Sequence, residues 1–168
     1  MRSIAGPSRR RRGHGWLNAR AKAGGRPPSP RPARRFALSP GLRELGVVGA
    51  RPLLILARNG VDHALVKYAA MSQGMPVAPV SPQYGLPGAN LARLAHAVEA
   101  LNPSAIYTED AALFSEALEA PFLAGLPVIA GKNARPGDVP LERLARAGGV
   151  EAAARPDDHA KYLLTSGS

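Results

Sequence analysis

Residues 53–80 read LLILARNGVDHALVKYAAMSQGMPVAPV and carry the pattern of a strand, a helix and a second strand in succession. Leu53–Ala57 is apolar at every position, which is typical of a strand covered on both faces of a parallel sheet. Val77–Val80 predicts a second short strand. Pro79 places that strand at a sheet edge or at a strand end, because proline has no backbone N–H to donate.

The helix between these two strands has both a predicted start and a predicted end. Asn59 can cap its first turn, and Gly74 suits the left-handed backbone that commonly follows a helix. Pro76 then prevents the helix from continuing. We expect one face of this helix to be formed by residues that recur three and four positions apart: Val61, Ala64, Leu65, Tyr68, Ala69 and Ser72.

The alternation of short apolar runs and amphipathic segments continues downstream. We expect a second helix that is capped by Asn90 and stopped at Asn102, then a strand at residues 105–108 and a third helix that begins at Asp110. Further strands are expected at residues 128–130 and 161–164, with one or two helical turns around residues 141–146. Strands that alternate with helices need crossover connections, so the sequence predicts an α/β fold with a mainly parallel sheet.

The excess positive charge lies in the N-terminal part of the chain. Residues 1–45 hold 12 Lys and Arg against one acid, whereas residues 46–168 hold 10 basic and 11 acidic residues. The formal net charge of +10 therefore describes the beginning of the chain and not its body. The sequence has no cysteine, which excludes disulfides, thiolate metal sites and cysteine nucleophiles. No apolar run approaches the roughly 18 residues that a membrane-spanning helix needs.

Residues 1–40 are rich in Arg, Pro and Gly and short of large apolar side chains, so we expect a disordered leader. Three interpretations stay open for it: an arm that binds nucleic-acid phosphates, an organelle transit peptide, or translated sequence that is not native coding sequence. The arm lacks interleaved aromatic residues, and prolines break the amphipathic helix of a transit peptide. As an alternative function, a basic-tailed α/β protein could bind nucleic acid or act as a scaffold without catalysis. Charge alone predicts only nonspecific binding.

Few residues follow a recognisable catalytic pattern. The four histidines share no metal-ligand spacing, and His63 and His96 suit helix surfaces. The acid pairs at residues 109–110 and 157–158 suit caps and solvated loops, because adjacent carboxylates point apart. The glycine motifs of dinucleotide and nucleotide loops are absent, as is the nucleophile elbow of hydrolases. We therefore predict no catalytic residue and no metal ligand in this chain.

The last four residues follow the short apolar run at residues 161–164, and they are Thr165, Ser166, Gly167 and Ser168. Small residues after a strand expose backbone N–H groups to an anion, so this segment is a candidate phosphate-binding loop. The same residue types also occur in ordinary linkers.

Residues 157–168, DDHAKYLLTSGS, resemble the approach to the phosphate loop of the AMP-forming acyl-CoA synthetases, which belong to the adenylate-forming superfamily. In that family the loop continues Thr-Gly-x-Pro-Lys. Residues 51–84 are similar to an early core segment of the same superfamily, and most similar to its feruloyl-CoA synthase branch. The resemblance extends over residues 41–168 and includes the order and spacing of both segments. Residues 1–40 match nothing in the family.

This resemblance implies an ATP-dependent carboxylate–CoA ligase. In such an enzyme a carboxylic acid attacks the α-phosphate of Mg·ATP, which gives an acyl-adenylate and pyrophosphate, and the CoA thiol then displaces AMP. The first half of the loop for the β- and γ-phosphates would consist of Thr165, Ser166, Gly167 and Ser168. Asn59 and Gly74 would be structural. The resemblance further implies an aromatic acid such as ferulate as the substrate, and a cytoplasmic location.

The family's other functional groups have no counterpart in the chain. The loop lysine, the acidic residue for Mg²⁺, the ribose aspartate, the acyl pocket and the C-terminal domain with its catalytic lysine all come later in family members. We therefore expect residues 41–168 to be an incomplete N-terminal AMP-binding domain behind the leader at residues 1–40. Such a fragment would bind no cofactor and have no activity alone. A sheet cut at Leu164 would leave strands unpaired, so we expect marginal folding at most.

Overall fold

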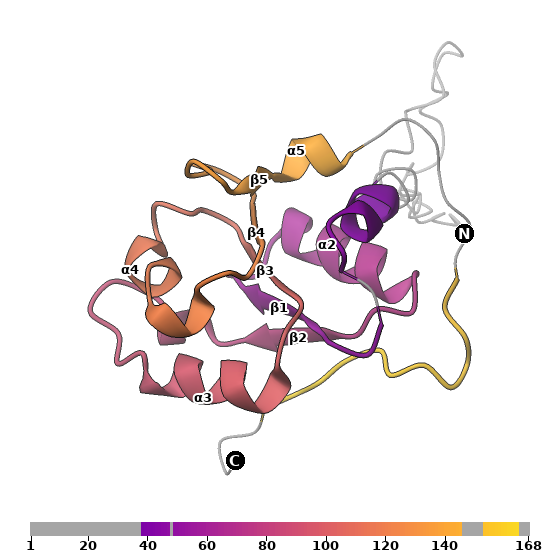
Figure 1. Cartoon of the computed structure of the whole chain (residues 1–168), viewed down its shortest axis with the longest axis horizontal. Helices are drawn as coiled ribbons and strands as arrows, with labels where there is room; N and C mark the ends of the chain where they lie inside the picture. Colours follow the sequence, from indigo (N-terminus) through magenta and orange to yellow (C-terminus); the bar gives the residue numbers. More distant parts are fainter. Residues whose placement is uncertain (1–37, 48, 146–152, 165–168) are drawn as a thin grey trace, which may run out of the picture.

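The computed structural model describes residues 38–47, 49–145 and 153–164. In these ranges one parallel sheet has the strand order β2-β1-β3-β4-β5 (Figure 1). The strands are β1 (Leu53–Leu56), β2 (Val77–Val80), β3 (Ala105–Thr108), β4 (Val128–Ala130) and β5 (Val139–Pro140). Every neighbouring pair is parallel, which confirms the predicted α/β fold.

Helices cover both faces of this sheet (Figure 1). The α-helices are α2 (Val61–Met71), α3 (Ala92–Leu101), α4 (Ser115–Leu118) and α5 (Leu141–Leu144), and 3₁₀ turns occur at Pro82–Tyr84 and Pro121–Leu123. A further helical segment spans residues 38–44. Its Leu38 is buried, so the packed region reaches three residues into the range that the sequence assigns to the leader.

Successive residues of β1 belong to two separate hydrophobic cores. Leu53 and Ile55 pack with α2, α5 and the segment at residues 38–44. Leu54 and Leu56 pack on the opposite face with α3 and α4. All four side chains are fully buried, which explains why the strand is apolar without alternation.

The structure corrects two details of α2. Gly60, not Asn59, is the N-cap residue, and no side chain caps the helix. The buried face is formed by Val66, Ala69 and Ala70. Val61 and Tyr68, which we expect on the apolar face, are 63% and 49% exposed. The face that packs carries two alanines, and small side chains let the helix lie close to the sheet.

The ends of the other predicted helices are largely as expected. The N-cap residue of α3 is Leu91, one position after the expected Asn90. Asn90 Oδ1 still accepts a hydrogen bond of 3.0 Å from the N–H of Ala92, the first residue of α3. Asn102 ends α3 in the left-handed conformation, with φ of 44°. Gly74 also takes a left-handed φ, of 72°, as predicted. Asp110 does not begin α4, which starts only at Ser115.

The expected final strand at residues 161–164 is wrong, and Pro79 explains why. Lys161 forms one isolated parallel bridge with Val77. Val77 donates to the carbonyl of Ala160 over 3.1 Å, and Tyr162 donates to the carbonyl of Val77 over 2.8 Å. The next donor toward this segment would be Pro79, which has no N–H, so the next bond of the ladder cannot form. This arrangement also confirms the prediction that β2, with its proline, lies at a sheet edge.

Among the described helices, none combines the length and the apolar character that a bilayer span requires.

Candidate functional site

The predicted phosphate-binding residues Thr165, Ser166, Gly167 and Ser168 lie outside the described residues. The structure does place the chain that leads to them. Tyr162 and Leu164 are partly buried against the core beneath α3 and α4, while Leu163 between them is 67% exposed. The approach to the predicted loop therefore runs along the outer edge of β2.

A second location is indicated by the order of the strands. The chain passes from β1 through α2 to β2 on one side, and then crosses through α3 to β3 on the other side of β1. The strand order thus reverses between β1 and β3. In open parallel sheets, ligands bind at the carboxyl ends of the strands where such a reversal occurs.

A crevice of about 160 Å³ lies at this point. Its lining comes from segments that are far apart in the sequence but end at the same edge of the sheet: Arg58 after β1, Asp62 and His63 in the first turn of α2, Tyr107 in β3, Glu109 and Asp110 after β3, and Lys132 after β4. Sequence reasoning did not identify this cluster, because only the strand order brings its members together. We call it the β1/β3 crevice.

Ionic and polar contacts hold the two acids of the crevice that follow β3. Glu109 Oε1 accepts from the backbone N–H of Arg58 over 3.2 Å and forms an ion pair with the guanidinium of Arg58. Asp110 Oδ1 accepts from Asn133 Nδ2 at 2.9 Å and from the N–H of Ala112 at 3.0 Å. The bond from Asn133 is the main cause that lowers the pKa of Asp110. Asp110 therefore caps the turn at residues 111–114 and not the first turn of a helix.

His63 is half-buried in the crevice, whereas His96 is exposed. The prediction that both histidines lie on helix surfaces is therefore fully correct only for His96. Burial lowers the pKa of His63 below its usual value near 6.5, so the ring is neutral at pH 7. Its Nδ1 lies 3.2 Å from the carbonyl oxygen of Arg58. A carbonyl can only accept, so Nδ1 carries the proton and Nε2 is left as an acceptor. Within the described residues, no group of three His, Cys, Asp or Glu side chains is arranged to hold a metal.

Tyr107 is the buried polar residue of the crevice. Its side chain is fully buried, and its hydroxyl has no hydrogen-bond partner among the described residues. Burial, helped by the charges of Asp62 and Glu109, raises the pKa of Tyr107, so the hydroxyl stays protonated and can donate. The available signal was a phenol near the carboxyl end of the buried run 105–108, two positions before the acid pair at residues 109–110.

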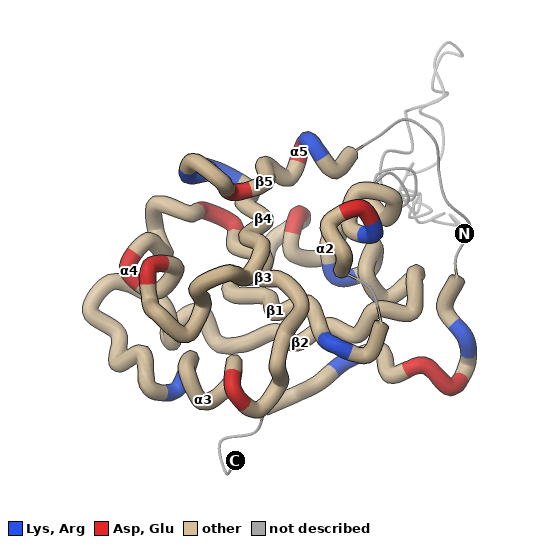
Figure 2. Tube along the Cα trace, in the orientation of Figure 1, with Lys and Arg blue, Asp and Glu red and all other residues tan. Residues whose placement is uncertain are grey.

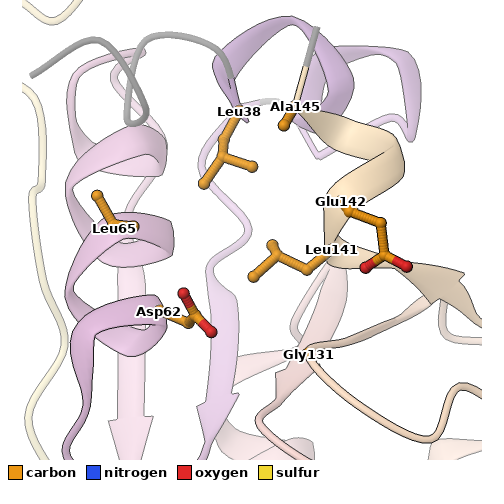
Figure 3. Close-up of a pocket in the computed structure, with 7 residues that line it drawn as sticks. All are labelled: Leu38, Asp62, Leu65, Gly131, Leu141, Glu142 and Ala145. Atoms are coloured by element: carbon orange, nitrogen blue, oxygen red, sulfur yellow. The ribbon is translucent and has the colours of Figure 1, made fainter. Parts of the chain in front are cut away.

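A larger cavity, of about 270 Å³, lies beside the crevice between α2 and α5 (Figure 3). The side chains of Leu38, Leu141 and Asp62 point into it (Figure 3). Asp62 is a lining residue of both spaces. The cavity is mainly apolar and offers no unpaired donor comparable to the hydroxyl of Tyr107 among its described lining residues.

No protein-family model matches the sequence, and no curated protein matches it. Solved structures match the fold. A benzoate CoA ligase from Burkholderia xenovorans LB400 is 23% identical, with a TM-score of 0.61 over 78% of this chain and 26% of the ligase chain. The amide bond synthetase McbA from Marinactinospora thermotolerans is 19% identical, with a TM-score of 0.61 over 81% of this chain and 27% of its own.

A long-chain-fatty-acid-CoA ligase from Archaeoglobus fulgidus is 18% identical, with a TM-score of 0.65 over 81% of this chain and 27% of its own. The chain thus spans about a quarter of the length of these structures. The described residues have the fold of part of an adenylate-forming enzyme domain.

Proposed function

We propose that this chain is part of an ATP-dependent carboxylate–CoA ligase of the adenylate-forming superfamily. The observation that carries the proposal is the agreement of a fold match with a local sequence resemblance. The parallel sheet matches a benzoate CoA ligase and a fatty-acid CoA ligase in fold. The segments at residues 51–84 and 157–168 separately resemble the same superfamily in sequence. Overall identity to these structures is only 18–23%, so the fold match extends beyond what overall sequence similarity indicates.

In this proposal the chain comprises a leader, predicted at residues 1–40, and an incomplete AMP-binding domain, predicted at residues 41–168. The last three residues of that leader already belong to the packed region. Thr165, Ser166, Gly167 and Ser168 form the first half of a loop for the β- and γ-phosphates of ATP. Hydroxyl and backbone N–H groups donate to phosphate oxygens without bulky side chains in the way. The lysine of the loop and the ligand of Mg²⁺ would come from elsewhere in the complete enzyme. The chain alone would then neither bind ATP tightly nor form an acyl-adenylate.

The acid that we propose as substrate is aromatic, such as ferulate. Support for this finer assignment is the similarity of residues 51–84 to the feruloyl-CoA synthase branch, together with the fold match to a benzoate CoA ligase. We also propose a cytoplasmic location, because the pools of ATP and CoA that the proposed reaction consumes are intracellular.

The gene itself provides the first test. Sequencing past codon 168 should reveal Thr-Gly-x-Pro-Lys in frame, and a protein extended to the end of that reading frame should release pyrophosphate from Mg·ATP when ferulate and CoA are added. Benzoate and a long-chain fatty acid serve as competing substrates. Equal or better turnover with the fatty acid would contradict the aromatic assignment, and no pyrophosphate with any acid would contradict the ligase.

A pair of variants tests the loop in that extended protein. Replacing Thr165 and Ser166 with alanine removes two phosphate donors, and we expect kcat/KM for Mg·ATP to fall about 10²-fold or more. Ser115→Ala is the matched control, because Ser115 begins α4 far along the chain from the predicted loop. An unchanged kcat/KM in the loop variant would overturn the assignment of these residues.

A further inference from the structure

The cavity between α2 and α5 has the composition of a small-molecule site, although the proposed ligase function makes no use of it. Most of its described lining is apolar and consists of Leu38, Leu65, Leu141 and Ala145, together with Gly131. Ligand sites in proteins are likewise concave and largely apolar, with a few polar groups that orient the ligand. The volume of about 270 Å³ corresponds to roughly nine waters in the liquid, which leaves room for a ligand of roughly eight non-hydrogen atoms. We call this space the α2/α5 cavity.

A carboxylate points into this apolar space. Asp62 lies in the first turn of α2, and its side chain is directed into the cavity together with those of Leu38 and Leu141 (Figure 3). Glu142 is also a lining residue, but its carboxylate points away from Asp62 (Figure 3). Of the described lining side chains, Asp62 is thus the one that offers a ligand a charged contact inside the cavity.

The carboxylate of Asp62 is not neutralised by a contact within the described part of the chain. The ion pairs there join Arg58 to Glu109 and Arg135 to Asp138, and neither pair includes Asp62. The cations on the neighbouring elements are not among the described lining residues of the cavity: Arg43, Lys67, Lys132 and Arg143. The charge of the described lining is therefore negative.

This charge favours one class of ligand. An ammonium group beside Asp62 gains a charge-assisted hydrogen bond as well as Coulomb attraction, whereas an anionic ligand would be repelled. The apolar walls add a second requirement, because only a ligand with apolar surface gains free energy by covering them. A bare inorganic cation meets the first requirement and not the second.

We propose that the α2/α5 cavity binds a small primary amine with an apolar body, whose ammonium group donates to Asp62 and whose body packs against Leu38 and Leu141. This ligand differs from the carboxylic acid, ATP and CoA of the proposed ligase. The inference rests on the cavity and its charge alone, so a failure of the ligase proposal would leave it intact.

Three probes separate the contributions of the charge and of the apolar body. Benzylamine has both, benzyl alcohol keeps the body without the charge, and methylamine keeps the charge without the body. Each probe is titrated at pH 7 into the full 168-residue chain, and the backbone amide shifts of Asp62, Leu65 and Leu141 are followed by NMR. We expect saturable shifts with benzylamine, and an affinity about tenfold or more above that of either other probe.

Each other outcome of these titrations would overturn the proposal. Benzyl alcohol that binds as tightly as benzylamine would show that the charge is not recognised. Methylamine that binds as tightly would show that the apolar walls contribute nothing. If no probe gives saturable shifts, the cavity is filled by water alone or by other parts of the chain, and it is not a ligand site.

Asp62→Asn tests the central contact and has a matched control. The variant removes the charge at nearly constant shape and at an exposed position, so we expect benzylamine affinity to fall about tenfold while benzyl alcohol affinity stays unchanged. Glu99→Gln removes one negative charge from an exposed position of α3, which packs on the opposite face of the sheet, and should leave benzylamine affinity unchanged. Equal losses in both variants would mean that the amine responds only to net charge. Undiminished affinity in Asp62→Asn would show that Asp62 does not contact the amine, and either result would contradict the proposal.

Ala145→Leu tests the place of binding without changing the charge. Ala145 is the exposed C-cap residue of α5 and lines the cavity (Figure 3). A bulkier side chain at this position narrows the space, so benzylamine affinity should fall about tenfold with little change in melting temperature. Undiminished benzylamine affinity in this variant would place the amine outside the α2/α5 cavity and contradict the proposal.

Discussion

The strand β1 is a short apolar run and residues 162–164 form another directly after Lys161, yet only β1 forms a strand. β1 pairs along its whole length with β2 on one side and β3 on the other. The segment at residues 161–164 makes one bridge to the outer edge of β2. The difference lies in the neighbour, because Pro79 cannot donate the next bond of the ladder. An apolar run therefore becomes a strand only where the adjacent strand supplies its half of the hydrogen bonds.

The largest expected effect on stability comes from a substitution in β1. Ile55 is fully buried in β1, and Ile55→Ala should reduce the free energy of unfolding by about 2–5 kcal/mol, because a cavity remains between α2 and the sheet. Leu163→Ala is the control in the C-terminal segment, where a 67% exposed side chain should contribute less than about 0.5 kcal/mol. Urea unfolding measures both. Similar losses of unfolding free energy in the two variants would contradict the proposed difference between β1 and residues 161–164.

Gly74 allows a sharper test of how the C-terminal segment packs. Its φ is +72°, and the carboxylate of Asp158 lies 2.7 Å from the place that a Cβ would occupy. Gly74→Ala should therefore cost about 1–2 kcal/mol of stability through strained backbone and the contact together.

The double variant Gly74→Ala, Asp158→Ala separates these two causes. It should recover the part of the loss that is due to the contact and keep the part that is due to the backbone. If Asp158→Ala restores nothing in thermal unfolding, residues 157–158 do not pack against this turn.

Pro79→Val tests the explanation for the missing strand. The variant restores an N–H at the outer edge of β2, so we expect the amide of residue 79 to be protected from hydrogen exchange by the carbonyl of Tyr162. The new bond should contribute about 0.5–1.5 kcal/mol, and the greater freedom of the unfolded chain should offset about 0.4–1 kcal/mol of it. The net change in stability is thus small. An unprotected amide at residue 79 would mean that proline is not what stops the ladder.

The smallest expected effect is on the pH dependence of stability, and it should differ between the half-buried His63 and the exposed His96. The pKa of His63 is lowered by burial, so the unfolded chain binds a proton more readily than the folded chain below about pH 6.5. Stability should therefore decrease as the pH falls from 7 toward 5.

Replacing His63 with asparagine should flatten this dependence, and His96→Asn, at an exposed position, should leave it unchanged. Unfolding curves at fixed pH values make the comparison. An identical pH dependence in the His63 variant and the parent would show that this ring does not titrate differently on folding.

The sequence predicted those parts of the fold that depend on local pattern. β1, β3 and β4 lie where their apolar runs predict, because burial on both faces leaves no charged position in these strands. The two-residue strand β5 was missed, since Val139–Pro140 is too short to have a pattern and contains a proline. The buried face of α2 was misjudged, because apolar residues occur nearly all round this helix.

The candidate site was less predictable than the fold. The predicted phosphate-loop residues 165–168 lie outside the described residues and stay a prediction. The β1/β3 crevice joins Arg58, His63, Tyr107 and Lys132, which are separated by up to 74 positions in the chain. Only the reversal of strand order brings them together, and no local motif encodes that order. The charges of the described body are interspersed along the trace and gather on no single element (Figure 2).

Amide hydrogen exchange on the full chain tests most directly the claim that a parallel sheet is complete at β1 and β3 and interrupted at its β2 edge. The account predicts slow exchange at Ile55 and Tyr107, intermediate exchange at Tyr162, whose N–H bonds to Val77, and fast exchange at Leu164. Protection at Leu164 equal to that at Tyr107, or fast exchange throughout β1 and β3, would contradict it.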